Sequence, residues 1–389
     1  MKKTIGKRLT GIGAICLAAM LVVAGCGSSG TTAGAAAGGD KVVKIGFFGP
    51  LSGDAATDGV HAKNGAELAV DQINAQGGVK GVKLQLVAED DQASSKDALN
   101  AVQKLIEQEK VSALVSGSYS GPTKTVNPIV QKSKVPMVVS YAVHPDITKG
   151  GDYIYRAIYT ADVQGDAMAE YAQSELGLKR FAVLYQDNDY GVSIQQAFSA
   201  KVKELGGSVP VSRAFKSGDK DFNPLLTAIK GAGVDAIYVA GYYNEAAQIC
   251  QQAKQLGVNV PVLGSDGFDS PKLIELGGAS TEGVTFTTPF NRDEPRDVVK
   301  NFVKTYKEKF KEDPDMTAAQ TYDSVELIAQ AMKTGSDKES IAKGLSQTKD
   351  FEGVTGNISF NAQHEAVKPV IFVKVDQGKF VFVKSISTK

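Results

Sequence analysis

The feature that most constrains the fold is an alternation of short apolar runs with longer segments that repeat apolar residues at helical spacing. Apolar runs of roughly 4–8 residues are typical of buried strands, and the longer segments are typical of helices. The expected strands are residues 42–48, 82–88, 111–115, 135–139, 153–158, 180–185, 208–214, 236–240, 260–263 and 283–287. The expected helices are residues 55–74, 94–109, 162–176, 190–205, 224–230 and 244–256. This alternation predicts an α/β fold, with parallel sheets that carry helices on both faces.

The pattern restarts near residue 160, which divides it into two similar halves. A chain of this length exceeds one hydrophobic core, so we expect two α/β lobes with a ligand between them. Further helices are expected at 295–310, 317–334 and 338–345. The chain should end in a β-hairpin that turns at Asp376-Gln377-Gly378.

The stretch from Val111 to Thr148 brings polar groups to one edge of a predicted sheet. Strand 111–115 runs into the turn SGSYSG, Pro122 suits the first turn of the next helix, and strand 135–139 ends at Ser140. Ligands of open α/β sheets lie at the carboxyl ends of the strands, and a helix N-terminus there favours an anion such as a carboxylate. The alternative, that Ser and Gly only form a tight turn, stays open.

The N-terminus is typical of an export signal. Basic residues precede the apolar run 12–23, which is too short to span a bilayer. The ending Val23-Ala24-Gly25-Cys26 resembles a bacterial lipobox, which implies cleavage before Cys26 and acylation of that residue. An ordinary signal with a chance cysteine is the alternative. We expect residues 1–25 to be a lipoprotein signal peptide and residues 26–40 to be a flexible tether.

Charge and cysteine content exclude several classes of protein. The chain has 43 basic and 43 acidic residues, and cleavage would remove four cations and no acids, so the mature chain is mildly acidic. Nucleic acid is therefore not an expected partner. Cys250 would be the one cysteine left in the mature chain besides Cys26, so no internal disulfide is expected, and Cys250 itself is expected in the core.

No motif in the chain indicates an enzyme. Ser120 is not the centre of a G-x-S-x-G elbow, and no phosphate-binding or dinucleotide-binding glycine motif occurs. His61, His144 and His364 have no metal-ligand spacing, so we expect them at the surface. We therefore predict no catalytic activity, no metal and no cofactor.

Motifs along the chain resemble those of the periplasmic leucine/isoleucine/valine-binding proteins. They are KIGFFGPLSGDAATDGV, NGAELAVDQINAQGGVKG, EDD, QDNDYG, GYYNEAAQICQQAKQLG and LGSDGFDSPKL. The resemblance covers residues 41–385 and implies a type I periplasmic binding protein, whose two Rossmann-like lobes are joined by three crossovers and close like a hinge. It also implies discontinuous lobes, which are residues 41–160 plus 289–368 and residues 161–288 plus 369–389.

The same resemblance implies ligand contacts at particular positions. Ser120 would bind a ligand carboxylate, and the backbone of Tyr141 would contact the ligand ammonium. Val143 falls where threonine is usual, so the N–H contact is kept and the hydroxyl is lost. Tyr190 and Tyr242 would cover the ligand from the second lobe, although a rim position without a ligand role is the alternative.

Two acidic residues also fall at ligand positions of the family. Asp266 lies where a glutamate holds the ammonium, and a buried acid needs a cationic partner, which favours an amine-bearing ligand. A turn-forming Asp before Gly is the alternative. Asp58 falls where an aromatic residue often meets the ligand side chain, so we expect a more polar pocket than one for leucine. Tyr119 and Phe268 are candidates for further walls.

The leading hypothesis is a non-catalytic receptor outside the cytoplasmic membrane, anchored to a bacterial membrane by lipid on Cys26. It would capture a small amino acid, branched-chain or similar, and present it to the permease of an ABC importer by closing its lobes. One alternative is a receptor for a related carboxylic acid without the amine. Another is a sensor module that acts through a protein partner, because fold alone does not determine function.

Overall fold

The computed structural model describes residues 41–387, and its first sheet has five parallel strands in the order β2-β1-β3-β4-β5. These strands are β1 (Val42–Gly49), β2 (Lys83–Asp90), β3 (Ala113–Ser116), β4 (Met137–Val139) and β5 (Ile154–Arg156). The helices between them are α1 (Ala56–Ala75), α2 (Ser95–Glu107), α3 (Ser120–Ser133) and the short 3₁₀ helix η1 (Thr148–Gly150). The signal peptide, the lipidation of Cys26 and the tether lie outside the described residues and stay predictions.

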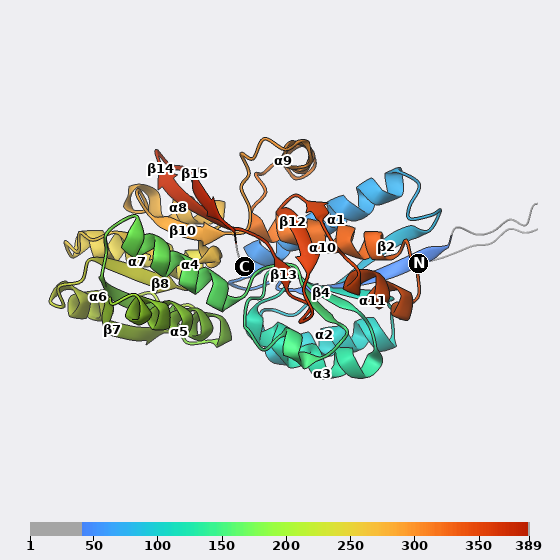
Figure 1. Ribbon diagram of the computed structural model, residues 1–389, viewed down its shortest axis with the longest axis horizontal. Helices are drawn as coiled ribbons and strands as arrows, with labels where there is room; N and C mark the ends of the chain where they lie inside the picture. Colours follow the sequence, from blue (N-terminus) through green and yellow to red (C-terminus); the bar gives the residue numbers. More distant parts are fainter. Residues whose placement is uncertain (1–40, 388–389) are drawn as a thin grey trace, which may run out of the picture. The chain divides into compact units, whose positions relative to one another are not determined.

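The side chains of β1 show which helices cover each face of this sheet. Ile45 and Phe47 pack into a core with α1 and α10 (Met316–Ala331), while Phe48 packs into a second core with α2 and α3. This division follows from the strand period of two, which sends successive side chains to opposite faces. Helices α1 and α10 come from distant parts of the sequence and lie side by side in Figure 1.

The second sheet has seven strands in the order β15-β14-β10-β9-β8-β6-β7. Five of them are mutually parallel, namely β6 (Arg180–Gln186), β7 (Ser208–Phe215), β8 (Ala236–Ala240), β9 (Val262–Gly264) and β10 (Thr285–Thr288). Helices α4 (Ala161–Ser174) and α5 (Asp189–Glu204) pack on one face. The other face carries α6 (Asn223–Lys230), α7 (Tyr243–Gln255) and α8 (Pro271–Gly277), and Cys250 of α7 is buried there as expected. The predicted α/β class is confirmed.

The predicted C-terminal hairpin is also confirmed. It consists of β14 (Val370–Asp376) and β15 (Lys379–Ile386), which pair antiparallel. The turn residues Gln377 and Gly378 have φ values of 50° and 69°, the left-handed geometry that suits a two-residue hairpin turn. Strand β14 pairs antiparallel with β10, so the end of the chain completes the second sheet (Figure 1).

A small third sheet is not predicted by the sequence pattern. It contains β11 (Phe351–Gly353), β12 (Gly356–Phe360) and β13 (Ala366–Val367), whose sequences FEG, GNISF and AV contain no apolar run of strand length. Helices α9 (Asp297–Phe310), α10 and α11 (Lys338–Ser346) precede it. The chain passes between the parts that carry the two large sheets after β5, after β10 and after β13.

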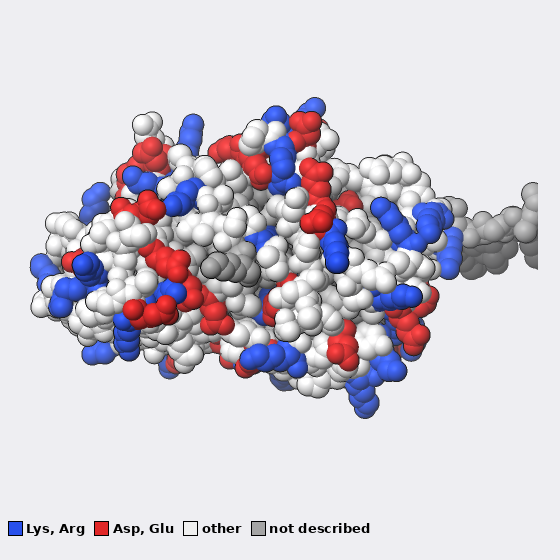
Figure 2. Space-filling model, in the orientation of Figure 1, with Lys and Arg blue, Asp and Glu red and all other residues white. Residues whose placement is uncertain are grey.

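Charged side chains of both signs are interspersed on the face shown in Figure 2. Such mixing gives no broad basic area on that face, in keeping with the near balance of acidic and basic residues in the sequence. Within residues 41–387, no helix is long and apolar enough to cross a membrane.

Candidate functional site

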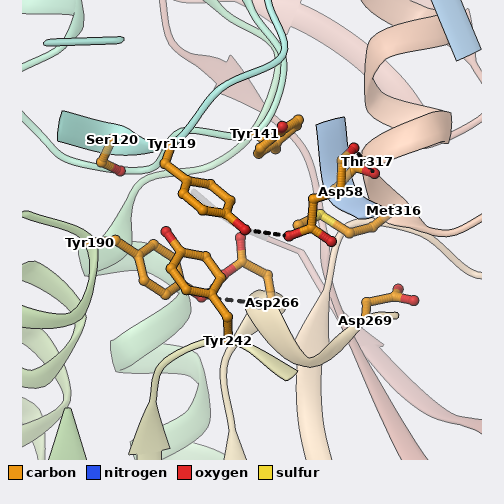
Figure 3. Close-up of a pocket in the computed structure, with 11 residues that line it drawn as sticks. Asp58, Tyr119, Ser120, Tyr141, Tyr190, Tyr242, Asp266, Asp269, Met316 and Thr317 are labelled. Atoms are coloured by element: carbon orange, nitrogen blue, oxygen red, sulfur yellow. Dashed lines mark hydrogen bonds between the residues drawn. The ribbon is translucent and has the colours of Figure 1, made fainter. Parts of the chain in front are cut away.

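One cavity is lined by residues that follow the carboxyl ends of strands in both large sheets. Residues after β3 and β4 approach it from the first sheet, and residues after β6, β8 and β9 approach it from the second. Its lining residues are Asp58, Tyr119, Ser120, Tyr141, Tyr190, Tyr242, Asp266, Gly267, Asp269, Met316 and Thr317 (Figure 3). The edge expected from the sequence to hold a ligand is therefore the edge that faces this cavity.

Ser120 provides one polar end of the cavity. It is the first residue of α3, it is 1% exposed, and its Oγ accepts a hydrogen bond of 3.3 Å from the backbone N–H of His144. Tyr119, the N-cap residue of α3, makes no side-chain hydrogen bond to the helix. The first backbone N–H groups of a helix have no partner inside the helix, and together with the helix dipole they favour an anion.

Asp266 provides the opposite kind of end. The Tyr190 hydroxyl donates to its Oδ1 over 2.6 Å, while its Oδ2 is buried and has no hydrogen-bond partner among the described residues. Burial raises the pKa of Asp266 to about 6, although its hydrogen bonds act in the opposite direction. A buried carboxylate oxygen without a donor is costly, so this atom is suited to an ammonium group supplied by a ligand.

The position after Asp266 requires glycine, because other groups lie too close to the backbone there to leave room for a Cβ. A Cβ at this position would lie 2.6 Å from the carbonyl oxygen of Gly241 and 2.8 Å from the Tyr190 hydroxyl. The Gly267 N–H donates to that hydroxyl over 2.8 Å, so the same tyrosine holds both Asp266 and the backbone after it.

Three tyrosines form a stack that fills much of the cavity. The ring of Tyr242 stacks on Tyr190 at 4.6 Å and on Tyr119 at 4.2 Å, with interplanar angles of 14° and 16°. Tyr141 meets Tyr119 edge-on at 6.4 Å, and its hydroxyl donates to the carbonyl oxygen of Gly117. Only about 10 Å³ is left for the centre of a water-sized sphere, which is room for about one water molecule.

Asp58 and Asp269 add two more carboxylates with different surroundings. Asp269 is close to a cation, since Arg292 Nη2 lies 2.5 Å from its Oδ1 and the Thr288 hydroxyl donates to its Oδ2. Asp58 is 5% exposed and accepts a hydrogen bond of 2.7 Å from the Tyr119 hydroxyl (Figure 3). Burial and the nearby charge of Asp315 raise the pKa of Asp58 to about 7.

The cavity brings together six of the residues expected at the site, and their roles toward a ligand stay predictions. These six are Ser120, Tyr141, Tyr190, Tyr242, Asp266 and Asp58. Val143 is not among the lining residues and its side chain is buried in the hydrophobic core, while the backbone N–H contact expected of it stays a prediction. Phe268 does not line it either and packs over Gly264 toward Phe286, whereas Tyr119 is a wall of the cavity.

Four lining residues are not identified by sequence reasoning, namely Gly267, Asp269, Met316 and Thr317. The first two belong to the segment LGSDGFDSPKL, whose motif drew attention only to Asp266. Met316 and Thr317 begin α10 and reach the cavity from a distant part of the chain, for which no local pattern gives a signal.

The expectation of surface histidines is wrong for His61, which is 9% exposed, and His144 and His364 are half-buried. His61 Nδ1 lies 2.5 Å from Asp315 Oδ2, and its Nε2 lies 3.3 Å from Glu312 Oε2. Burial alone would lower the pKa of His61, but the charge and hydrogen bond of Asp315 outweigh it and raise that pKa to about 9.

The pair of His61 and Asp315 is expected to make the free energy of unfolding depend on pH. A raised histidine pKa stabilises the fold fully below the unfolded value of about 6.5, and the contribution is lost as the pH rises through 9. Urea unfolding should therefore show the wild type losing about 1–3 kcal/mol more than His61→Gln between pH 6 and pH 10. Parallel profiles for the two proteins would contradict this assignment.

The fold and the site together define an α/β protein with two large sheets and a cavity between their strand ends. The model of the periplasmic binding protein family matches residues 42–379, so the chain belongs to that family of extracytoplasmic solute-binding proteins, which are not enzymes. No group of residues suited to hold a metal ion occurs within residues 41–387.

Relatives and solved structures agree with this family. A leucine-, isoleucine-, valine-, threonine- and alanine-binding protein of Pseudomonas aeruginosa is 31% identical, over 82% of this chain and 86% of its own. The leucine-binding protein LivK of Thermotoga maritima is 34% identical with a TM-score of 0.84, and covers 89% of this chain and 99% of its own. The substrate-binding protein LivJ of Streptococcus pneumoniae, solved with isoleucine, is 36% identical with the same TM-score of 0.84, over 90% of this chain and 100% of its own. The type I periplasmic binding protein fold is thereby confirmed.

Proposed function

We propose that this protein captures a small α-amino acid, of branched-chain size, between two lobes and delivers it to an ABC importer. The observation that carries the proposal is the pairing of two opposite ends in one cavity. Ser120 and the start of α3 suit a carboxylate, and Asp266, with its unpartnered Oδ2, suits an ammonium. An α-amino acid is the smallest common ligand that satisfies both ends at once.

The relatives support this assignment. The Pseudomonas aeruginosa protein is named for binding leucine, isoleucine, valine, threonine and alanine, and the Streptococcus pneumoniae structure contains isoleucine. The latter is described as the substrate-binding protein of a branched-chain amino acid transporter, which supports delivery to a transporter here.

Capture would follow from closure of two lobes, residues 41–160 plus 289–368 and residues 161–288 plus 369–389. Contacts that cross this division support such closure. Tyr119 stacks on Tyr242, and Lys124 Nζ lies 2.8 Å from Asp189 Oδ1. A ligand held by Ser120 and Asp266 would add contacts only when the lobes are together, so its binding shifts the population toward the closed form.

Anchoring by lipid on Cys26, with residues 26–40 as a tether, would hold the receptor beside its importer at a bacterial membrane. The lipobox-like ending Val23-Ala24-Gly25-Cys26 supports this part of the proposal. Mass spectrometry of the mature protein should find a lipid-modified N-terminal cysteine, and an unmodified or uncleaved N-terminus would contradict it.

A thermal-shift screen tests the binding proposal. The purified protein is unfolded and refolded to remove carried ligand, then mixed with amino acids and with the matching acids that lack the amine. A ligand at a hundred times its Kd should stabilise the fold by about 2.7 kcal/mol. We expect shifts with amino acids and none with their deaminated partners. Shifts with the deaminated acids alone, or silence across the panel, would overturn the proposal.

A further inference from the structure

The charged residues that line the cavity are all acids, and two of them, Asp58 and Asp266, form no ion pair with a described residue. Asp58, Asp266 and Asp269 line the cavity, and no lysine or arginine does so among the described residues. Arg292 offsets Asp269, and the proposed ligand ammonium would offset Asp266. Asp58 is therefore the carboxylate that neither the protein nor the α-amino group of a ligand accounts for.

The nearby histidine is already engaged with other acids. His61 has Asp315 at its Nδ1 and Glu312 at its Nε2, so neither ring nitrogen is directed to Asp58. The charge of His61 lowers the pKa of Asp58, but burial and Asp315 outweigh that effect. In a buried setting, the ionised form of Asp58 needs a further donor.

Tyr119 supplies that donor in this structure. Its hydroxyl lies 2.7 Å from Asp58 Oδ2, and its ring lies inside the cavity against Tyr242 of the opposite lobe (Figure 3). The cavity has room for about one water molecule, so lining groups have to move before a ligand can enter. The Tyr119 ring is one of these groups, and its movement would leave Asp58 without this hydrogen bond, which is costly for a buried acceptor.

We propose that Asp58 selects the ligand by its side chain and favours an amino acid whose side chain carries a hydrogen-bond donor, a hydroxyl or an ammonium. The donor takes the place of the Tyr119 hydroxyl at Asp58 Oδ2. This inference rests on the proposed function, because it assigns Ser120 to the α-carboxylate of the amino acid and Asp266 to its α-ammonium. An aliphatic side chain of the same shape offers Asp58 no donor, so it binds more weakly.

Matched ligand pairs test this inference by titration calorimetry on the refolded protein. Threonine and valine have the same shape and differ by a hydroxyl in place of a methyl, and ornithine and norleucine differ by an ammonium in place of a methyl. In the pair whose size suits the cavity, we expect the amino acid with the side-chain donor to bind about 10- to 100-fold more tightly than its aliphatic partner. The two pairs distinguish a hydroxyl ligand from a cationic one.

The variant Asp58→Leu keeps the branched shape of the side chain and removes its oxygens. We expect it to abolish or reverse the preference within each pair, while far-UV circular dichroism confirms the fold. Asp71→Leu makes the same exchange on the exposed surface of α1, where Asp71 pairs with Lys309, and it should keep the wild-type preference.

The outcomes separate the two proposals. A wild type that binds valine and norleucine at least as tightly as their partners would overturn the role of Asp58 and leave the amino-acid receptor intact. A preference that persists in Asp58→Leu would also overturn it, because the donor would then be recognised elsewhere. Absence of binding to all four, together with shifts for other amino acids in the thermal-shift screen, would overturn this inference alone, whereas silence in both experiments would overturn the receptor proposal as well.

Discussion

Replacing Asp266 by asparagine is expected to weaken amino-acid binding by about 100-fold or more, because the ligand ammonium would lose its buried counter-charge. Asparagine has nearly the same shape and can still accept the hydrogen bond from Tyr190, so the cavity should persist. Titration calorimetry on the refolded protein measures the effect, and thermal unfolding without ligand checks the fold.

A ligand control accompanies this variant. The deaminated acid that matches the best amino acid has no ammonium, so its weak affinity should not fall in Asp266→Asn. An equal loss for both ligands would show that the substitution damages the cavity generally. An unchanged affinity for the amino acid would contradict the assignment of Asp266 to the ammonium.

The second large effect is expected on the free energy of unfolding, when Asp323 of α10 is replaced. Asp323 is fully buried and accepts hydrogen bonds from the backbone N–H groups of Val354 and Thr355, and from the Thr355 hydroxyl. Its charge also offsets that of buried Lys368, whose pKa burial lowers to about 7. Asp323→Ala removes this acceptor and counter-charge, so we expect the free energy of unfolding to fall by about 3–5 kcal/mol.

Urea unfolding followed by circular dichroism measures this loss, since the sequence contains no tryptophan. Glu308→Ala is the matched control, because that acid is largely exposed and should change stability by less than about 0.5 kcal/mol. The double variant Asp323→Ala, Lys368→Met should regain part of the loss, because the lysine charge is gone as well. A single variant as stable as the control would contradict the role given to Asp323.

The fold could be predicted because its information is local. Strand and helix periodicities repeat along the chain, and the turn at Gln377 and Gly378 is set by two residues that accept positive φ. The strands β11 to β13 are not predicted because their sequences, FEG, GNISF and AV, contain no apolar run of strand length. Their pairing depends on neighbours in the folded structure and leaves no period in the sequence.

Most of the predicted site residues are delivered by strand ends, whereas Asp58, in α1, is expected from the family resemblance alone. Ser120, Tyr190, Tyr242 and Asp266 follow strand ends, so their meeting at one edge follows from the parallel arrangement. The direction of a side chain after a strand end is harder to predict, and the Val143 side chain points into the core, which leaves only its backbone N–H for the expected contact.

Long-range pairing explains the remaining differences. His61 is buried because Asp315 supplies an opposite charge from a position 254 residues away, which no local pattern indicates. The same segment brings Met316 and Thr317 to the cavity. The hydrogen bond from Tyr119 to Asp58 likewise joins two elements, α1 and the start of α3, that only the fold places together.

A crystal structure grown with an amino acid that binds would test the central claim most directly. The account predicts the ligand carboxylate at Ser120 and the first N–H groups of α3, its ammonium at Asp266 Oδ2, and the Tyr119 ring moved out of the cavity. A ligand bound outside this cavity, or one with its ammonium away from Asp266, would contradict the account.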